Sequence, residues 1–505
     1  MFFGQSAAMT QYFTLLLDCP LVIVVIFIAS IGGTFHYGYC LSAMTSSSPF
    51  LKILMNESIL HRYNVQLEAS QISLIWSFTV SMFCVGGLLG SLAAGLLVSK
   101  FGRKKCLLFN NFLVISGALL MLFSKKAASF EMIIVGRFLY GISAGVCLTA
   151  HPLYVLECTP KRLSGMVGVT LSTSASFGRF CGQLLGISEL LGTEENWPWL
   201  LGFTGFTALF QLVTLPFLPE SPSFLLLQSG DHQACEKALK RLRGDKDYSR
   251  EVEEMLEEKA ALQCVRSRSV WELIQDQTVR WQLITIVICF ITLQFSGITA
   301  VYFYSSDVFR TAGMPEEKLP YAAVGTGLCE VFTSAACCML IENTGRKVLM
   351  FRGYIAMALT LALVTITLYF RSHVSWMPYC SMVLIFVFIF FYAIGPGAVT
   401  APLPSQIFPQ AFKSAAYTVA CTLSWTVLFM LGLLFPLIVE SLDYFCFVIF
   451  LVFCLACGTF VKFNIPEMKN QTALEIAAAF ERMHGKSGES ETKTSIDNSL
   501  YETKL

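Results

Sequence analysis

One short stretch occurs twice in this chain and decides how the rest is interpreted. Gly95–Lys105 reads GLLVSKFGRKK, and Glu342–Lys347 reads ENTGRK, so the same Gly-Arg-Lys turn recurs in the second half of the chain. Each copy follows a long apolar run. Glycine permits a tight turn, and cations favour the inner face of a membrane. The pattern predicts a duplicated set of helices with this turn at the same place in both copies.

The composition is that of a membrane protein. Of the 505 residues, 55% are hydrophobic and 14% are charged, whereas a soluble domain carries about 25% charged residues. One membrane-spanning helix needs about 20 apolar residues. This composition excludes a soluble enzyme, a nucleic-acid-binding protein and a disordered chain, and the continuous apolar runs exclude a β-barrel.

Six apolar runs precede a charged insert, and six follow it. They lie near residues 20–43, 73–98, 106–123, 130–156, 165–188, 197–218, 281–306, 319–341, 348–370, 379–402, 414–440 and 443–463. We therefore expect an all-α membrane protein with twelve transmembrane helices in two six-helix bundles. A parallel duplication of this kind is the hallmark of the major facilitator superfamily.

The division of the chain follows from these runs. We expect a cytoplasmic N-terminus (1–19), an N-terminal bundle (20–218), a cytoplasmic linker of solvated helices (219–280), a C-terminal bundle (281–465) and a cytoplasmic tail (466–505). Lys and Arg gather after the second, fourth and eighth runs, and such an excess marks cytoplasmic loops. Asn56-Glu57-Ser58 then falls in the first outer loop, where a glycan can be attached to Asn56.

The chain shows no pattern of an enzyme or a metalloprotein. Many of the 18 cysteines lie inside apolar runs, where a thiol packs as a small hydrophobic side chain, and no zinc-site spacing occurs. Glycine-rich stretches such as Gly86-Gly87-Leu-Leu-Gly90 are typical of helix packing in membranes and not of phosphate binding. We expect no catalytic residues, no metal and no cofactor.

Several motifs, in order and correctly spaced, resemble those of the sugar-porter branch of this superfamily. They are Gly136-Arg137, Pro152-Leu-Tyr154-Val-Leu-Glu157-Cys-Thr-Pro160, Pro219-Glu220-Ser221-Pro222, Gln294-Phe-Ser-Gly297, Gly395-Pro396-Gly397 and Pro466-Glu467. More narrowly, residues 20–470 resemble the facilitative glucose-transporter family of animals, class II, the fructose-type group. The resemblance implies a sugar site at mid-membrane between the bundles, open alternately to each side.

A sugar needs amide and hydroxyl partners for its hydroxyls and aromatic faces for its ring. Gln294 and Gln183 match the sugar-binding glutamines of the family. The other candidates are Ser172, Ser296, Thr299, Tyr302, Tyr304, Tyr392, Ala401, Ser424 and Trp425. A single Tyr or Trp can equally serve helix packing or an interface belt, whereas an amide at mid-membrane needs a partner.

Departures from the family pattern affect this site. Leu293 and Ser172 replace glutamines, and Thr299 and Cys40 replace asparagines. Each lost partner in a buried hydrogen-bonded site costs about 1–3 kcal/mol, so glucose is expected to bind weakly. Ala401 stands where glucose-selective members carry tryptophan, and a roomier site is consistent with fructose. Proton-coupled relatives carry a carboxylate at the position of Cys40, which favours passive uniport.

The resemblance also implies a charged gate at the cytoplasmic helix ends. Its expected members are Arg103, Glu157, Glu220, Glu342, Arg346 and Lys413. In the family, such charges pair across the bundles and hold the outward-facing state shut. Other members are replaced here by Ser99, Ser164, Ser223, Asn343 and Gln406. Because the loss of several pairs shifts a balance of a few kcal/mol, we expect an inward-facing bias.

Two charged residues lie within apolar runs, Arg179 in the fifth and Glu330 in the eighth. Charges at this depth are costly and mark function by default, and the resemblance places both at the central cavity. Three hypotheses remain open. The two residues form an ion pair that takes part in gating, or Arg179 receives an anionic substrate such as urate with Glu330 modulating it, or Arg179 snorkels or pairs structurally. Glu330 also leaves proton transfer open, since a buried acid can carry a proton.

The sequence therefore predicts a uniporter of the plasma membrane that carries a hexose, fructose first and glucose second, by alternating access. The alternatives are a carrier of another small solute, such as urate, and a sugar sensor that does not transport. The expected partners are the hexose and the lipid bilayer, without nucleic acid. The ending Thr503-Lys504-Leu505 also suits a PDZ groove, which binds a C-terminal carboxylate.

Overall fold

The computed structural model describes residues 19–160, 163–263, 268–370, 373–442, 445–468, 471 and 473–484. The side chains at 164–169, 258–259, 261–263, 338–344, 405, 410, 440 and 473–474 are outside this description. The first 18 residues and the predicted PDZ ligand at Thr503-Lys504-Leu505 also lie outside the described residues.

Helices account for nearly all of the described chain. The first half contains α2 (Pro20–Gly32), α3 (Thr34–Tyr63), α4 (Ala69–Phe101), α5 (Arg103–Ser124), α6 (Glu131–Cys158), α7 (Ser164–Leu185) and α8 (Trp197–Thr214). The insert contains η2 (Leu215–Phe217), α9 (Pro222–Leu227), α10 (His232–Arg243), α11 (Ser249–Gln263), α12 (Val270–Gln275) and η3 (Gln277–Val279).

The second half repeats the pattern of long helices. It contains α13 (Arg280–Phe295), α14 (Ile298–Thr311), η4 (Glu316–Lys318), α15 (Leu319–Thr344), α16 (Arg346–Tyr369), α17 (Met377–Ile394), α18 (Pro396–Thr400), α19 (Leu403–Ile407), η5 (Gln410–Phe412), α20 (Lys413–Leu442) and α21 (Cys446–Asn464), followed by α22 (Ala473–His484). Among the described residues, ten helical segments are long and apolar enough to cross a membrane. With α7 and α15, of 22 and 26 residues, they make up the twelve predicted spans.

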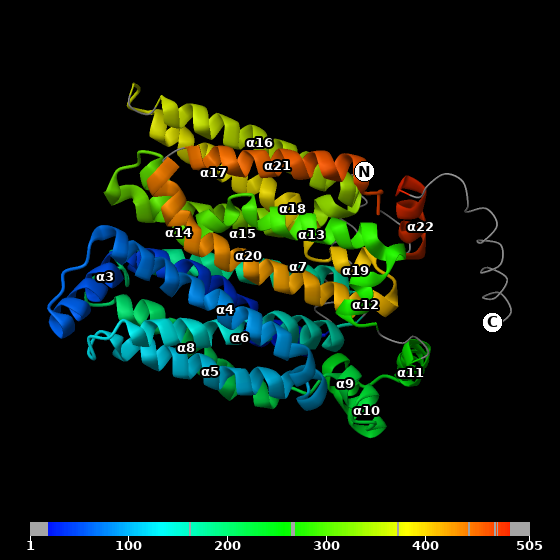
Figure 1. Cartoon of the computed structure of the whole chain (residues 1–505). Helices are drawn as coiled ribbons and strands as arrows, with labels where there is room; N and C mark the ends of the chain where they lie inside the picture. The colour runs from blue at the N-terminus through cyan, green and yellow to red at the C-terminus, as the bar shows by residue number, and fades with distance from the viewer. Residues whose placement is uncertain are drawn as a thin grey trace.

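The two halves form two bundles that lie side by side (Figure 1). In the first, α6 packs on α4 and α5, and α3 packs on α7. In the second, α16 packs on α17 and α21, and α13 packs on α20. The pairs α4–α20, α7–α15 and α3–α14 join the bundles. The predicted architecture of two bundles with a helical linker is therefore confirmed.

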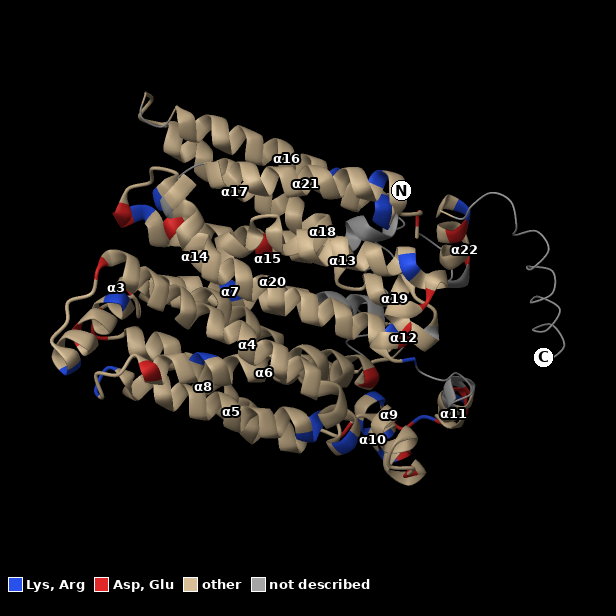
Figure 2. Ribbon diagram, in the orientation of Figure 1, with Lys and Arg blue, Asp and Glu red and all other residues tan. Residues whose placement is uncertain are grey.

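The charged side chains gather at the two ends of the bundles and are sparse between them (Figure 2). This is the distribution that a membrane imposes, because a charge is costly at the depth of the hydrocarbon. One end carries α9 to α12 and α22 (Figure 1), and we call it the linker end. The opposite end, where α3 and α14 terminate, is the loop end.

The first span is longer than the sequence predicted. The apolar run ends near residue 43, but α3 continues as a helix to Tyr63. The serines at 46–48 interrupt the apolar run without ending the helix, because Leu51, Leu54 and Met55 still form a buried stripe at helical spacing. Asn56 therefore lies in a helix near the loop end and not in a loop, and its Oδ1 accepts from the Leu67 amide at 3.4 Å.

Close helix packing in the first bundle depends on glycine. A Cβ added at Gly86 or Gly90 of α4 would lie 2.2 Å from a backbone oxygen of α6, and one at Gly141 of α6 would lie 2.1 Å from a backbone oxygen of α4. The two backbones touch at these positions. The predicted packing role of this glycine-rich stretch agrees with the contact.

Candidate functional site

The two charges predicted within the spans meet between the bundles. Arg179 of α7 donates from Nε to Glu330 Oε2 of α15 at 2.9 Å, and its Nη2 donates to Glu330 Oε1. Both side chains are buried, at 10% and 7% exposure. This bidentate pair is the strong form of a charge-assisted contact. The structure thus brings together the two residues whose pairing was one of three hypotheses.

Tyr302 of α14 is the third member of this charged cluster. Its hydroxyl donates to Glu330 Oε1 at 2.9 Å, and its ring lies 4.6 Å from the Arg179 guanidinium carbon, within the range of a cation–π contact. Ser176 of α7 adds two contacts, accepting from Arg179 at 3.2 Å and donating to Glu330 at 3.4 Å. Three helices, from both bundles, therefore converge on one buried ion pair.

A neutral contact lies one helical turn further toward the loop end. Gln183 of α7 donates from Nε2 to Thr326 Oγ1 of α15 at 3.1 Å, and its Oε1 is buried without a hydrogen-bond partner. Beyond it, the Tyr321 hydroxyl of α15 donates to Glu189. That hydrogen bond lowers the pKa of Glu189, which lies in the turn after α7. The loop-end halves of α7 and α15 are therefore in contact along their length.

The seventh span is broken at the predicted sugar-binding motif. Gly297 separates α13 from α14 with φ of +100°, a conformation that favours glycine. Across the break, Thr299 donates to the Gln294 side-chain oxygen at 2.8 Å. Gln294 is half-buried, whereas Thr299 is buried. Interrupted helices of this kind form the binding sites of many transporters.

An aromatic group lies on the other side of the junction between the bundles. Trp425 of α20 donates from its indole nitrogen to Ser91 of α4 at 2.9 Å. Its ring meets Tyr37 and Phe83 of the first bundle edge-on, at 6.2 Å and 5.9 Å between ring centres. The predicted Trp425 therefore contacts both bundles and offers an aromatic face near their junction.

The remaining candidates do not form one group. The Tyr304 hydroxyl donates a hydrogen bond to the Gly432 carbonyl oxygen at 2.5 Å, inside the second bundle. Tyr392 lies close enough to Glu330 and Arg179 to interact with their charges. Ser172 and Ala401 are exposed, and Ser424 is half-buried on α20. Tyr304 therefore has the packing role that was weighed against sugar binding.

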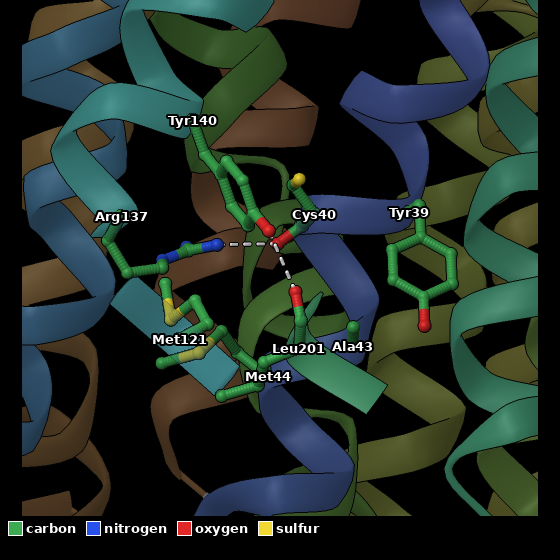
Figure 3. Close-up of a pocket in the computed structure, with 8 residues that line it drawn as sticks. All are labelled: Tyr39, Cys40, Ala43, Met44, Met121, Arg137, Tyr140 and Leu201. Atoms are coloured by element: carbon green, nitrogen blue, oxygen red, sulfur yellow. Dashed lines mark hydrogen bonds between the residues drawn. The ribbon is translucent and has the colours of Figure 1, made fainter. Parts of the chain in front are cut away.

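A second buried cation, Arg137 of α6, lies inside the first bundle (Figure 3). It donates to the Cys40 carbonyl at 2.6 Å and to the Val80 carbonyl at 3.2 Å, over the face of Phe83. No carboxylate in the described part of the chain pairs with it. The adjoining cavity, also lined by Tyr140, has a volume of about 10 Å³, the size of one water molecule.

The repeated Gly-Arg-Lys turns are built alike at the linker end. Gly102 and Gly345 have φ of +93° and +85°, and each precedes a helix. Glu220 accepts from the Lys104 amide at 2.8 Å, and Glu467 accepts from the Arg346 amide at 3.1 Å. A carboxylate at a helix N-terminus is favourable because of the free amides and the helix dipole. Glu220 and Arg346, predicted as gate residues, thus take part in matching helix caps.

Arg103 and Glu157 form an ion pair at 2.8 Å, but the pair joins α5 to α6 within one bundle. Glu157 also accepts from Ser221 at the start of the linker. In this arrangement the pair therefore stays within the first bundle, and the expected pairing across the bundles in the outward-facing state stays a prediction. Lys413 begins α20, and the side chain of Glu342 lies outside the described residues.

We expect Glu467→Gln and Glu220→Gln each to lower the free energy of unfolding by about 0.5–2 kcal/mol, the usual contribution of a helix cap. Thermal unfolding of the purified protein in detergent measures this. Glu481→Gln, an exposed change on α22, is the matched control. Equal effects of all three substitutions would contradict a capping role.

Sequence reasoning did not commit to several partners in this region. Ser176 and Thr326 lie three and four residues from Arg179 and Glu330, on the same helix faces, and this spacing was an available signal. Tyr302 was one of several tyrosines in the seventh span. Tyr37 and Ser91 gave no signal in the sequence, because their contacts with Trp425 depend on how the two bundles meet.

The chain is similar to known membrane transporters. The model of the family "Sugar (and other) transporter" matches residues 25–480. Solute carrier family 2, facilitated glucose transporter member 9 of Mus musculus is 40% identical over 91% of this chain and 85% of its own length. Member 11 of Homo sapiens is 40% identical over 93% and 95%, and member 5 of Bos taurus is 40% identical over 92% and 93%.

Solved structures give the same fold at lower sequence identity. The proton:xylose symporter XylE bound to 6-bromo-6-deoxy-D-glucose is similar with a TM-score of 0.72 and 20% identity, over 92% of this chain and all of that one. The inward open conformation of XylE from E. coli has a TM-score of 0.74 and 19% identity, over 91% and 99%.

Proposed function

Because the chain belongs to the sugar transporter family of the major facilitator superfamily, as a relative of the facilitated glucose transporters, we propose that it carries a neutral hexose across the plasma membrane. Fructose is the first candidate and glucose the second. The proposed mechanism is passive uniport by alternating access. The protein itself is a multi-pass membrane protein of this family.

The observation that carries the proposal is the set of uncharged polar groups at the junction of the bundles. Gln183 and Thr326 meet across it, and Gln294 and Thr299 meet across the break in the seventh span. Trp425 supplies an aromatic face. Amide and hydroxyl groups match the hydroxyls of a sugar, and the indole matches its apolar face.

The surroundings of Arg137 support transport without proton coupling. The resemblance places a carboxylate of proton-coupled relatives where this chain has Cys40, and Cys40 lies beside Arg137 (Figure 3). A thiol does not replace a carboxylate as a proton carrier at neutral pH. Sugar flux that is indifferent to a pH gradient is therefore expected.

Ala401 supports fructose over glucose, because its small side chain in the broken tenth span leaves room where glucose-selective relatives carry tryptophan. The linker end, rich in basic residues, is proposed to be cytoplasmic, with both termini on that side. Contacts along the loop-end halves of α7 and α15, and from Thr45 to the Phe303 carbonyl at 3.2 Å, support the expected inward-facing bias.

The two alternatives have less support. An anionic substrate such as urate would have to compete with Glu330 for Arg179, because Glu330 already accepts from Nε and Nη2 of the guanidinium. A sugar sensor that does not transport has the same fold, and only a flux measurement separates it from a carrier.

Uptake of labelled fructose and glucose into proteoliposomes, with and without a pH gradient, tests the proposal. We expect saturable fructose flux. Gln294→Ala should raise the apparent KM by about fivefold to 150-fold, the effect of losing about 1–3 kcal/mol of hydrogen bonding. Gln233→Ala on exposed α10 is the matched control. Correctly inserted protein without hexose flux would overturn transport in favour of the sensor.

A further inference from the structure

A buried cation at the junction of the bundles is already neutralised by the protein itself. Arg179 contacts both carboxylate oxygens of Glu330, and the two side chains are almost fully buried. A guanidinium and a carboxylate in this geometry have no net charge. A solute that arrives between the bundles therefore meets a dipole and not a free charge.

The carboxylate of Glu330 also accepts hydrogen bonds from three residues. Its Oε2 accepts from Arg179 Nε at 2.9 Å. Its Oε1 accepts from Arg179 Nη2, from Tyr302 at 2.9 Å and from Ser176 at 3.4 Å. Three of these four donors contact Oε1 and one contacts Oε2, so the carboxylate is held by side chains of the protein on both of its oxygens. Because Arg179 and Glu330 neutralise each other, a charged substrate meets no uncompensated charge at this pair.

We propose that Glu330 sets the charge of the accepted substrate. By holding Arg179 in an ion pair, it makes the site selective for neutral sugars and excludes the same sugars in carboxylate form. The inference rests on the proposed function for the identity of the sugar, and it assigns Glu330 a role in specificity in place of direct sugar binding.

Removal of Glu330 would leave the buried Arg179 without its anionic partner. Among the described residues, the Tyr302 ring and the Ser176 hydroxyl would still contact Arg179, and neither carries a negative charge. An uncompensated buried charge is strongly unfavourable, and an anion that enters from water relieves it. A substrate carboxylate is therefore expected to take the place of the missing glutamate.

Tyr302 is a positioning residue in this scheme, because it acts through the pair. Its hydroxyl orients the Glu330 carboxylate and its ring covers the Arg179 guanidinium. Tyr302→Phe keeps the ring and the ion pair while it removes one of the four donors. The preference for neutral sugars should therefore persist in Tyr302→Phe, which separates the charge of the pair from its hydrogen bonds.

The test compares D-glucose with D-glucuronate, which carries a carboxylate in place of the terminal CH2OH. Initial uptake into proteoliposomes and ligand-induced thermal stabilisation in detergent are measured for the full-length protein. In the unmodified protein we expect at least a tenfold preference for glucose. In Glu330→Gln the ratio of glucuronate uptake to glucose uptake should rise at least tenfold.

Three further variants isolate the charge. Arg179→Gln combined with Glu330→Gln should return the ratio to within about threefold of the original, because the free cation is gone. Arg179→Gln alone should not raise it. Glu131→Gln breaks an exposed ion pair with Arg62 at the loop end, of 2.6 Å, and should leave the ratio unchanged.

An unchanged ratio in folded Glu330→Gln, or a ratio in the double variant as high as in Glu330→Gln, would overturn the inference. If Glu330→Gln does not fold, Arg179→Gln tests the same idea with a cationic substrate. Its unpaired Glu330 carboxylate should raise the uptake of protonated glucosamine relative to glucose at least tenfold. No rise in this ratio would count against the proposal. Stabilisation by the ligand is measured separately from flux. Absent transport would refute the proposed function. The ratio of glucuronate binding to glucose binding would still test whether Glu330 sets the charge of the accepted substrate.

Discussion

Removing either member of the Arg179–Glu330 pair should destabilise the protein strongly, while removing both should not. Arg179→Gln or Glu330→Gln alone leaves a buried charge without its partner and is expected to lower the free energy of unfolding by about 3–5 kcal/mol. The double variant leaves two neutral amides of similar size and should lose about 1 kcal/mol. Thermal or denaturant unfolding of the four proteins in detergent gives the coupling energy.

The coupling should be at least about 2 kcal/mol, which is large for a pair of residues. Arg62→Gln with Glu131→Gln is the control cycle, because that pair is exposed and should couple by less than about 1 kcal/mol. Additive losses at positions 179 and 330 would mean that the contact contributes nothing as a pair, and the structural explanation of both charges would fail.

Gly86→Ala should also have a large effect. A Cβ at this position would lie 2.2 Å from the Phe138 carbonyl oxygen, a backbone atom that cannot rotate away. The helices α4 and α6 must then separate, and we expect a loss of about 3 kcal/mol of unfolding free energy, at the upper end for overpacking. Folded yield and thermal unfolding in detergent measure this loss.

The same helix provides the matched control. Gly95 lies in α4 with nothing within 4 Å of an added Cβ. Gly95→Ala should therefore stabilise the protein by about 0.5–1 kcal/mol, because alanine loses less backbone entropy in a helix than glycine. If both substitutions changed stability by the same amount and sign, close contact between α4 and α6 would not be the reason for the glycines.

The overall architecture could be predicted from the sequence because apolarity and length are local properties of each span. The repeat of the Gly-Arg-Lys turn then related the two halves. The true end of α3 could not be predicted from hydropathy, since Leu51, Leu54 and Met55 continue the buried face after polar residues that end the apolar run. A helix can extend beyond its apolar run when one of its faces remains buried.

The candidate site was predictable in part. Arg179 and Glu330 stood out because a charge within an apolar run is rare, but the sequence left three roles open until the helices carrying them were seen to touch. Tyr302 could not be separated from Tyr304 by residue type, yet one binds the ion pair and the other the Gly432 carbonyl. The two tyrosines lie two positions apart in α14, and Tyr304 itself has non-helical φ and ψ of −135° and 36°, so their side chains reach different partners.

The predicted gate residues show a second limit of prediction from sequence, which concerns contacts between distant residues. Arg103 and Glu157 lie at the linker end and pair with each other within one bundle, a contact that the sequence pattern did not specify. Glu467 caps a helix whose first residue lies 121 positions earlier in the chain, and a sequence pattern does not reveal a contact over that separation.

The matching caps at Glu220 and Glu467 also define the unit that was duplicated. Glu220 caps α5 and Glu467 caps α16, each the third span of its half, but each glutamate lies after the sixth span. The repeated module is therefore six spans plus the Pro-Glu pair that follows them. A half-molecule cut at residue 218 would leave the first turn of α5 without its carboxylate. Two separately produced halves should therefore be divided within the linker beyond Ser221, so that each half keeps the residue that closes its own fold.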